Sequence, residues 1–188
     1  MEKPPFIKDN NNIIRICKYY KKIEDYDKMM KFLFLALKEK YIFPLFELGL
    51  YYQTVEFDYD NMKKYYLMAI DNNHTDSMFN LAVYYQTIEI NPMLMEKYYL
   101  MAINNNHVNS MFNLAMYYTK INPTLMKKYY LMAIDNNHTD SMFNLGLYYQ
   151  FTEINYELMR KYYSMAIENN CIDAEINLDI HNQSIINV

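Results

Sequence analysis

The chain has 188 residues, of which 52% are hydrophobic and 21% charged, a balance that favours a packed core over a disordered chain. Its formal net charge of −4 provides no basic surface for a phosphate backbone, so we expect no nucleic acid as partner. No stretch approaches the roughly 18 uninterrupted apolar residues of a membrane span, and residues 1–12 lack the apolar run of a signal peptide. We therefore expect a soluble intracellular protein without membrane insertion.

The amino-acid composition bears on the source of the protein. With 22 Tyr, 16 Met, no Trp, two Gly and abundant Asn, Ile and Lys, the chain has the mixture that AT-rich codons encode. This composition suggests that the source is a giant DNA virus or a protist. We therefore expect the protein in the cytoplasm or, if it is viral, in the host cytoplasm or the virion. Cys17 and Cys171 lie near opposite ends of the chain, so no disulfide is expected and a reducing compartment fits.

A repeated ten-residue motif organises the sequence. It occurs at 77–86 as SMFNLAVYYQ and returns at 110 and 141, with a looser copy from 44 and a degraded one from 174. The spacings of 33, 33, 31 and 33 residues are typical of stacked supersecondary units. In chain order we predict a tail over 1–12, repeats over 13–40, 43–73, 76–106, 109–137 and 140–170, a capping helix over 172–181 and a tail over 182–188.

Each repeat is predicted to contain two helices. In the first, here called helix A, Met78, Leu81, Ala82 and Tyr85 recur at i, i+3, i+4 and i+7, the apolar stripe of an amphipathic helix. The second, helix B, repeats the pattern Met-x-x-Tyr-Tyr-x-x-Ala-Ile from residue 62 onward, and one tyrosine of each pair is expected on the core stripe. The fold class is therefore all-α: an α-solenoid of about five antiparallel helix pairs with a C-terminal capping helix.

Helix ends and close contacts agree with this period. Helix B is preceded by side chains that favour the N-cap: Asp25, Asp58, Asn91, Asn122 and Asn155. Helix A is preceded by Asp76, Asn109, Asp140 or Asp173, and helix B ends in an Asn pair suited to a left-handed closing residue. Small residues recur where the two helices should cross: Gly49, Ala82, Ala115 and Gly146 on helix A, and an Ala on each helix B.

The segment Leu81-Ala82-x-x-Tyr85, followed by Lys97-Tyr98-Tyr99-x-x-Ala102, resembles the tetratricopeptide superfamily and, within it, the Sel1-like repeats. Twelve residues separate the helix-B Ala from the next helix-A Leu, as in Sel1-like turns, whereas the glycine-rich loop of that family is absent. The resemblance covers about residues 13–181. It implies a right-handed superhelix whose concave groove, lined by helix A, binds a peptide or protein.

The peptide-binding groove of such families places an Asn one residue before the helix-A Leu, where its amide can bind the backbone of an extended ligand. Applied to this chain, the resemblance predicts a groove with apolar residues beside the Asn ladder. The predicted groove residues are Phe79, Asn80, Val83, Gln86, Phe112, Asn113, Met116, Phe143, Asn144, Leu147, Gln150 and Asn177. The alternative is that the Phe side chains pack between adjacent repeats.

Three other residue patterns could indicate functional sites: the recurring His, the Tyr pairs and catalytic motifs. His74, His107 and His138 recur about 10 Å apart in a solenoid, too far to share a zinc ion, so we expect no metal and interpret them as caps of helix B. The Tyr pairs are interpreted as packing residues, not as base-stacking platforms. No catalytic motif or cofactor-binding loop is present, so we expect neither an enzyme nor a cofactor. The first functional hypothesis is a protein-binding adaptor, and the alternative is a structural or self-assembling protein of undetermined oligomeric state.

Overall fold

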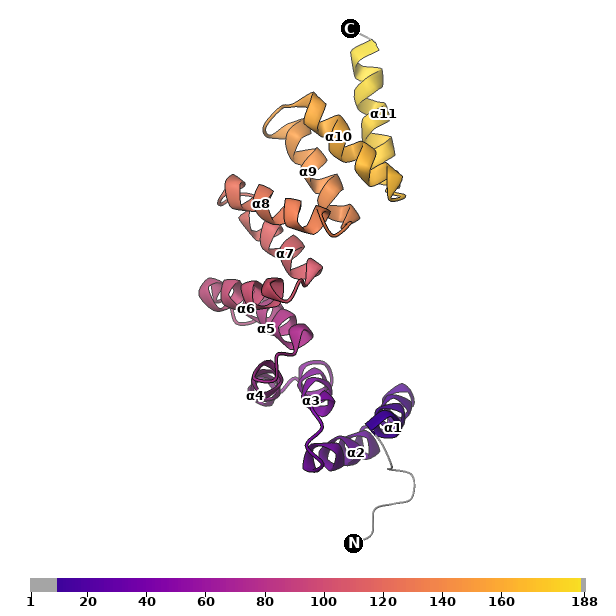
Figure 1. Cartoon of the computed structure of the whole chain (residues 1–188), viewed down its shortest axis with the longest axis vertical. Coiled ribbons are helices and arrows are strands. Elements are labelled where there is room, and N and C mark those ends of the chain that lie inside the picture. The colour runs from indigo at the N-terminus through magenta and orange to yellow at the C-terminus, as the bar shows by residue number, and fades with distance from the viewer. Residues whose placement is uncertain (1–9, 187–188) are drawn as a thin grey trace. The chain divides into compact units, whose positions relative to one another are not determined.

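The computed structural model describes residues 10–186, and within that range the chain is all-helical, as predicted (Figure 1). The helices in the A position are α1 (Asn10–Lys22), α3 (Phe43–Thr54), α5 (Thr75–Thr87), α7 (Val108–Tyr118) and α9 (Thr139–Phe151). Those in the B position are α2 (Tyr26–Lys38), α4 (Tyr59–Ile70), α6 (Pro92–Asn104), α8 (Pro123–Ile134) and α10 (Tyr156–Glu168), and α11 (Ile172–Ile186) follows. Both end helices extend beyond the limits of 13 and 181 suggested by the sequence.

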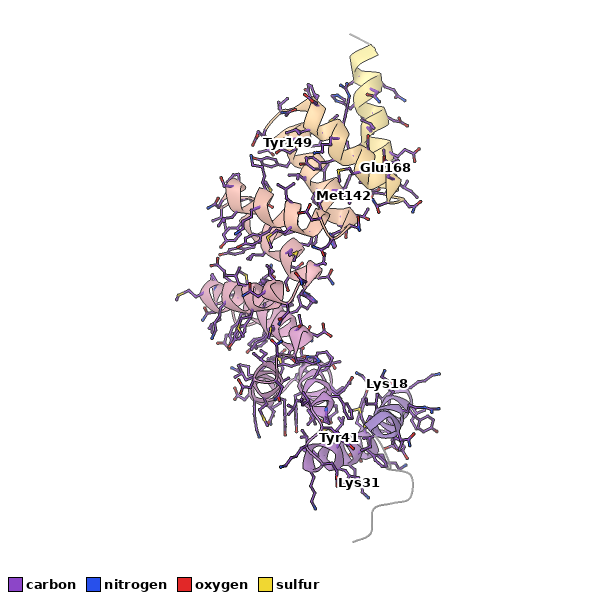
Figure 2. All side chains as sticks on the ribbon, viewed as in Figure 1. Lys18, Lys31, Tyr41, Met142, Tyr149 and Glu168 are labelled. Atoms are coloured by element: carbon purple, nitrogen blue, oxygen red, sulfur yellow. The ribbon has the colours of Figure 1, made fainter. Side chains whose placement is uncertain are left out.

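Consecutive helices pack as pairs, α1 with α2, α3 with α4, α7 with α8 and α9 with α10. The chain divides into two compact units, residues 1–102 and residues 103–188. The first unit holds α1 to α5 and most of α6, and the second holds α7 to α11. In the second unit, Met142 and Tyr149 of α9, both labelled in Figure 2, are buried. The Tyr149 ring stacks on Tyr162 of α10 with 5.8 Å between centroids.

The predicted caps of helix B are confirmed. The side chains of Asp25, Asp58, Asn91, Asn122 and Asn155 each accept a hydrogen bond from the backbone N–H three residues later, at 3.0–3.2 Å. At the other end, Asn73 has φ of 60° and its N–H donates to Ile70 O, while His74 N–H donates to Ala69 O. These are the two hydrogen bonds of a Schellman closure, with Asn in the left-handed place that Gly usually takes.

The predicted caps of helix A are wrong. His74, His107 and His138 occupy the N-cap position, and in each the imidazole Nδ1 accepts from the backbone N–H of the serine three residues later, at 3.2 Å. Asp76 lies instead in the first turn of α5. The histidines therefore begin helix A, where the sequence interpretation assigned them to the end of helix B. Their Nδ1 acts as an acceptor, which places the proton of the neutral ring on Nε2.

Helix B is more deeply buried than expected, because both tyrosines of each pair are in the core. Tyr65 and Tyr66 are 8% and 0% exposed, and the pairs of α6, α8 and α10 are buried in the same way. The first tyrosine stacks on a helix-A ring, as Tyr65 does on Tyr52. The second lies under the small helix-A residue: a Cβ built on Gly49 would collide with the Tyr66 ring, so an Ala at this position would require the ring to shift.

The last helix, α11, has the helix-A register but a different set of residues. Ala174 and His181 are buried, whereas Glu175, Asp179 and Asn182 are exposed. These three occupy the places that Met142, Gly146 and Tyr149 hold in α9, which face helix B of the same repeat. No helix B follows α11 within the described residues, so the side chains in these three places are exposed to water. Polar residues suit such exposed places.

Candidate functional site

A pocket of about 590 Å³ opens in the second unit between α7, α8 and α9. We call it the α7–α9 pocket. It is lined by Met116, Tyr117, Thr119, Lys120, Ile121, Met126, Tyr130, Asn144, Leu147, Tyr148, Phe151 and Thr152. Its volume lies within the range of about 300–1,000 Å³ that is usual for ligand pockets.

The pocket has a buried apolar floor and an exposed apolar rim. Met126 and Tyr130 are at most 2% exposed, whereas Met116, Ile121 and Phe151 are 46%, 61% and 68% exposed. Large apolar side chains that gather at the surface are costly to leave in water, and such clusters commonly mark interaction sites. The pocket can therefore bury apolar surface of a partner without rearranging the core beneath it.

The pocket lies at the one repeat with the shorter spacing. Ser110 and Ser141 are 31 residues apart, whereas the copies before and after are 33 apart. The two missing residues shorten helix A: α7 has 11 residues, and α5 and α9 have 13 each. The end of α7 and the turn after it form one wall of the pocket, Met126 and Tyr130 of α8 lie beneath, and the C-terminal part of α9 forms the opposite wall.

The shortening also changes a hydrogen bond at the floor. In the full-length repeats the second helix-B tyrosine donates its hydroxyl to a Gln near the end of helix A, as Tyr163 does to Gln150 at 2.5 Å. Thr119 stands at that position in the short repeat, and the Tyr130 hydroxyl donates instead to Met116 Sδ at 2.9 Å. Thioether sulfur is a weak acceptor, so Met116 is held mainly by packing. Burial raises the pKa of Tyr130, and the phenol stays neutral at physiological pH.

Three of the predicted groove residues, Met116, Asn144 and Leu147, meet in the α7–α9 pocket. Met116 is exposed, and the other two are half-buried. Asn144 donates one Nδ2–H to the carbonyl of Asp140 in its own helix, at 2.7 Å. Asn177 of α11 makes the same bond to Asp173 O but does not line the pocket.

The predicted Phe residues pack largely against other side chains. Phe79 lies 6.1 Å from the Tyr99 ring, Phe112 6.1 Å from Tyr130 and Phe143 5.9 Å from Tyr163, between ring centroids. The Phe112 ring also contacts the capping imidazole of His138 in the next repeat, at 4.9 Å. These contacts agree with the alternative that the Phe ladder joins helices and repeats.

Three further groove residues have internal hydrogen bonds. Gln86 accepts from the Tyr99 hydroxyl at 2.5 Å, in the same way as Gln150 accepts from Tyr163. Asn80 donates to the Tyr66 hydroxyl of the preceding repeat at 3.1 Å. Val83 and Asn113 are half-buried. The structure thus gives much of the predicted ladder a part in packing, and it brings three members from α7 and α9 together around the α7–α9 pocket.

One ion pair lies close to the pocket. Lys127 Nζ donates to Glu153 at 2.7 Å, and the hydroxyl of the lining residue Tyr148 donates to the same carboxylate at 3.0 Å. The bond from Lys127 and then that from Tyr148 hold the pKa of Glu153 below its usual value, and Glu153 in turn raises the pKa of Lys127. Among the residues that line the pocket, Lys120 is the charged one.

Lys120, Ile121 and Phe151 were not among the predicted site residues. Two signals in the sequence mark them: the shorter spacing at this repeat, and the Phe at the position of Thr54 and Thr87 in earlier repeats. Both signals are departures from the repeat pattern, so a comparison of equivalent positions in the repeats does not find them.

Two further properties bear on function. No group of three or more His, Cys, Asp or Glu side chains within residues 10–186 is arranged to hold a metal ion. None of the described helices is long and apolar enough to cross a membrane.

No family model matches the sequence, and no curated protein matches it. Its similarity to solved structures is clear. A Sel1 repeat protein from Oxalobacter formigenes aligns over 92% of this chain and 78% of its own, with a TM-score of 0.70 and 18% identity. A protective antigen of uropathogenic Escherichia coli strains with an SLR fold aligns over 90% of this chain and 40% of its own, with a TM-score of 0.71 and 16% identity. An immunity protein from Pseudomonas aeruginosa aligns over 92% and 69%, with a TM-score of 0.56 and 18% identity. The chain has the Sel1-repeat fold.

Proposed function

We propose that the protein is a non-catalytic interaction scaffold, an adaptor that binds a segment of a partner protein along the helix-A side of its repeats, with the α7–α9 pocket as the principal binding element. The observation that carries this proposal is the group of exposed apolar side chains around a buried floor, Met116, Ile121 and Phe151 over Met126 and Tyr130. Burial of apolar surface is the main driving force of protein association, at about 25 cal/mol per Å².

The polar lining supports a peptide ligand. Asn144 uses one Nδ2–H within its own helix, and no further hydrogen bond of its amide is made within the described residues. The carbonyl oxygen and the second N–H of this amide can pair with one donor and one acceptor of an extended backbone. A partner segment is thereby oriented while its side chain enters the pocket. An intracellular location and a viral source remain predictions from composition.

The exposed face of α11 favours an adaptor over end-to-end assembly through this helix. Stacking of a further helix on α11 would bury Glu175 and Asp179. Burial of an unpaired carboxylate costs roughly several kcal/mol of free energy.

Site-specific photo-crosslinking tests the proposal. The photoreactive residue p-benzoylphenylalanine replaces Met116 at the pocket or, as a control, Met93 of α6, which is 84% exposed and does not line the pocket. After irradiation in the cells that make the protein, we expect a discrete protein adduct from position 116 and none of the same mass from position 93. Identical adducts from both positions, or none from position 116, would contradict the proposed site.

A further inference from the structure

We infer that the partner segment carries a large apolar side chain with an acidic side chain, Asp or Glu, within two residues of it. The apolar side chain enters the α7–α9 pocket and the carboxylate pairs with Lys120. This inference rests on the proposed function, because it assigns the chemistry of the segment that the pocket receives.

The apolar half of the assignment follows from the shape of the pocket. Phe151 and Ile121 stand at its rim and Met126 and Tyr130 form its floor. A rim of flexible and aromatic side chains over a rigid floor suits one inserted Leu, Met, Phe or Tyr, since interface anchors are large side chains in water-excluded pockets. A large side chain buries more apolar surface in this pocket than a small one does, and so binds more tightly.

The acidic half follows from the charges around the opening. Lys127, the neighbouring cation on α8, is held by Glu153 and does not line the pocket. Lys120 lies in the turn after α7, is exposed, and is the charged residue of the lining. A carboxylate beside the anchor complements this charge, whereas a Lys or Arg there would meet it with repulsion. Such complementarity at a rim contributes more to selectivity than to affinity.

Selection from a displayed library of random 12-residue peptides on the full chain tests the inference. We expect enriched peptides with a large apolar residue and an Asp or Glu within two positions of it. For a synthetic, fluorescein-labelled enriched peptide, Phe151→Ala should weaken binding about ten-fold, whereas the matched surface change Ile154→Ala should have little effect. Phe151 and Ile154 are 68% and 66% exposed, so neither substitution disturbs the core.

Charge reversal separates the two halves of the argument. Lys120→Glu should weaken binding of the acidic peptide about two- to five-fold and shift a repeated selection toward Lys or Arg beside the anchor, since exposed pairs contribute little affinity. Lys128→Glu, an exposed change on α8 outside the pocket, is the control. If Phe151→Ala weakens binding but the flanking charge is random on both wild type and Lys120→Glu, the acidic partner is wrong and the proposed function stands. If the enriched peptides ignore Phe151→Ala, both are wrong.

Discussion

The two complete repeats of the second unit, α7–α8 and α9–α10, differ by two residues at the end of helix A, and only the shorter one leaves its buried helix-B tyrosine at the floor of the α7–α9 pocket. In the longer repeat, Tyr163 is covered by Gly146, Phe143 and Gln150. In the shorter repeat, Tyr130 keeps its Phe partner but loses the Gln. The longer repeat keeps its tyrosine closed under Phe143 and Gln150, whereas the shorter repeat leaves Tyr130 at the floor of the pocket, and α9 of the longer repeat supplies the opposite wall.

The largest expected difference concerns these tyrosine rings. Tyr163→Ala should destabilise the protein by about 3–5 kcal/mol, because it leaves a closed cavity under α9. Tyr130→Ala should cost at least about 1 kcal/mol less, because the space it leaves joins an open pocket that water can enter. Urea unfolding followed by circular dichroism at 222 nm measures both. Equal losses would mean that the pocket floor is packed as tightly as the full-length repeat.

A second comparison uses the helix crossing. A Cβ on Gly146 would lie 2.5 Å from Cδ1 and 2.6 Å from Cε1 of the buried Tyr163 ring, so Gly146→Ala should destabilise the protein by about 1–2 kcal/mol despite the better helix propensity of Ala. The reciprocal change in the short repeat, Ala115→Gly, should cost about 1–2 kcal/mol through the lower helix propensity of Gly and the loss of a buried methyl group. A more stable Gly146→Ala variant would show that the Tyr163 ring can move aside to admit the added methyl group.

A smaller effect is expected from the hydroxyl groups. Tyr163→Phe removes a hydrogen bond to the amide oxygen of Gln150 and should cost about 0.5–1.5 kcal/mol. Tyr130→Phe removes a bond to the Met116 sulfur, a weak acceptor, and an interaction with the Thr119 side chain, and should cost less than Tyr163→Phe. Because both rings remain in place, the same unfolding experiment isolates the hydroxyl contribution. A greater loss from Tyr130→Phe would mean that the sulfur contact holds the pocket rim in position.

The repeat period predicted the fold because each position recurs in the same environment. Asp58 and Asn122 cap their helices as expected, since a capping bond depends only on the few residues that follow it. The histidine caps were missed because His is an uncommon N-cap residue, and Asp76 two positions later is a better one by preference alone. Local patterns thus predicted helices reliably and their first residues less so.

The site was harder to predict, for a physical reason. A ladder of equivalent residues identifies what the repeats share, and what they share is mostly packing, as with Gln86 on Tyr99 and Phe143 on Tyr163. The pocket depends on where one repeat departs from the rest, and its shape depends on how far α7 extends over α8, which follows from packing in three dimensions. Met116 was predicted as a groove residue, whereas Ile121 was not.

The smallest effect concerns the turn after helix A. The longer repeat carries Glu153 there, bonded to Lys127 and Tyr148, whereas the shorter repeat carries Lys120. Because the folded-state pKa of Glu153 is lowered, its contribution to stability is present above the unfolded value of about 4.3 and is lost as the pH falls below it toward the folded value. Glu153→Gln should therefore lower the urea midpoint slightly at pH 7 and make it less sensitive to acid between about pH 4.5 and 3. Glu168→Gln, at the exposed end of α10, is the matched control for the loss of a surface carboxylate. If Glu153→Gln retains the wild-type slope, the ion pair near the pocket contributes nothing to stability, and its role is limited to holding Lys127 away from the opening.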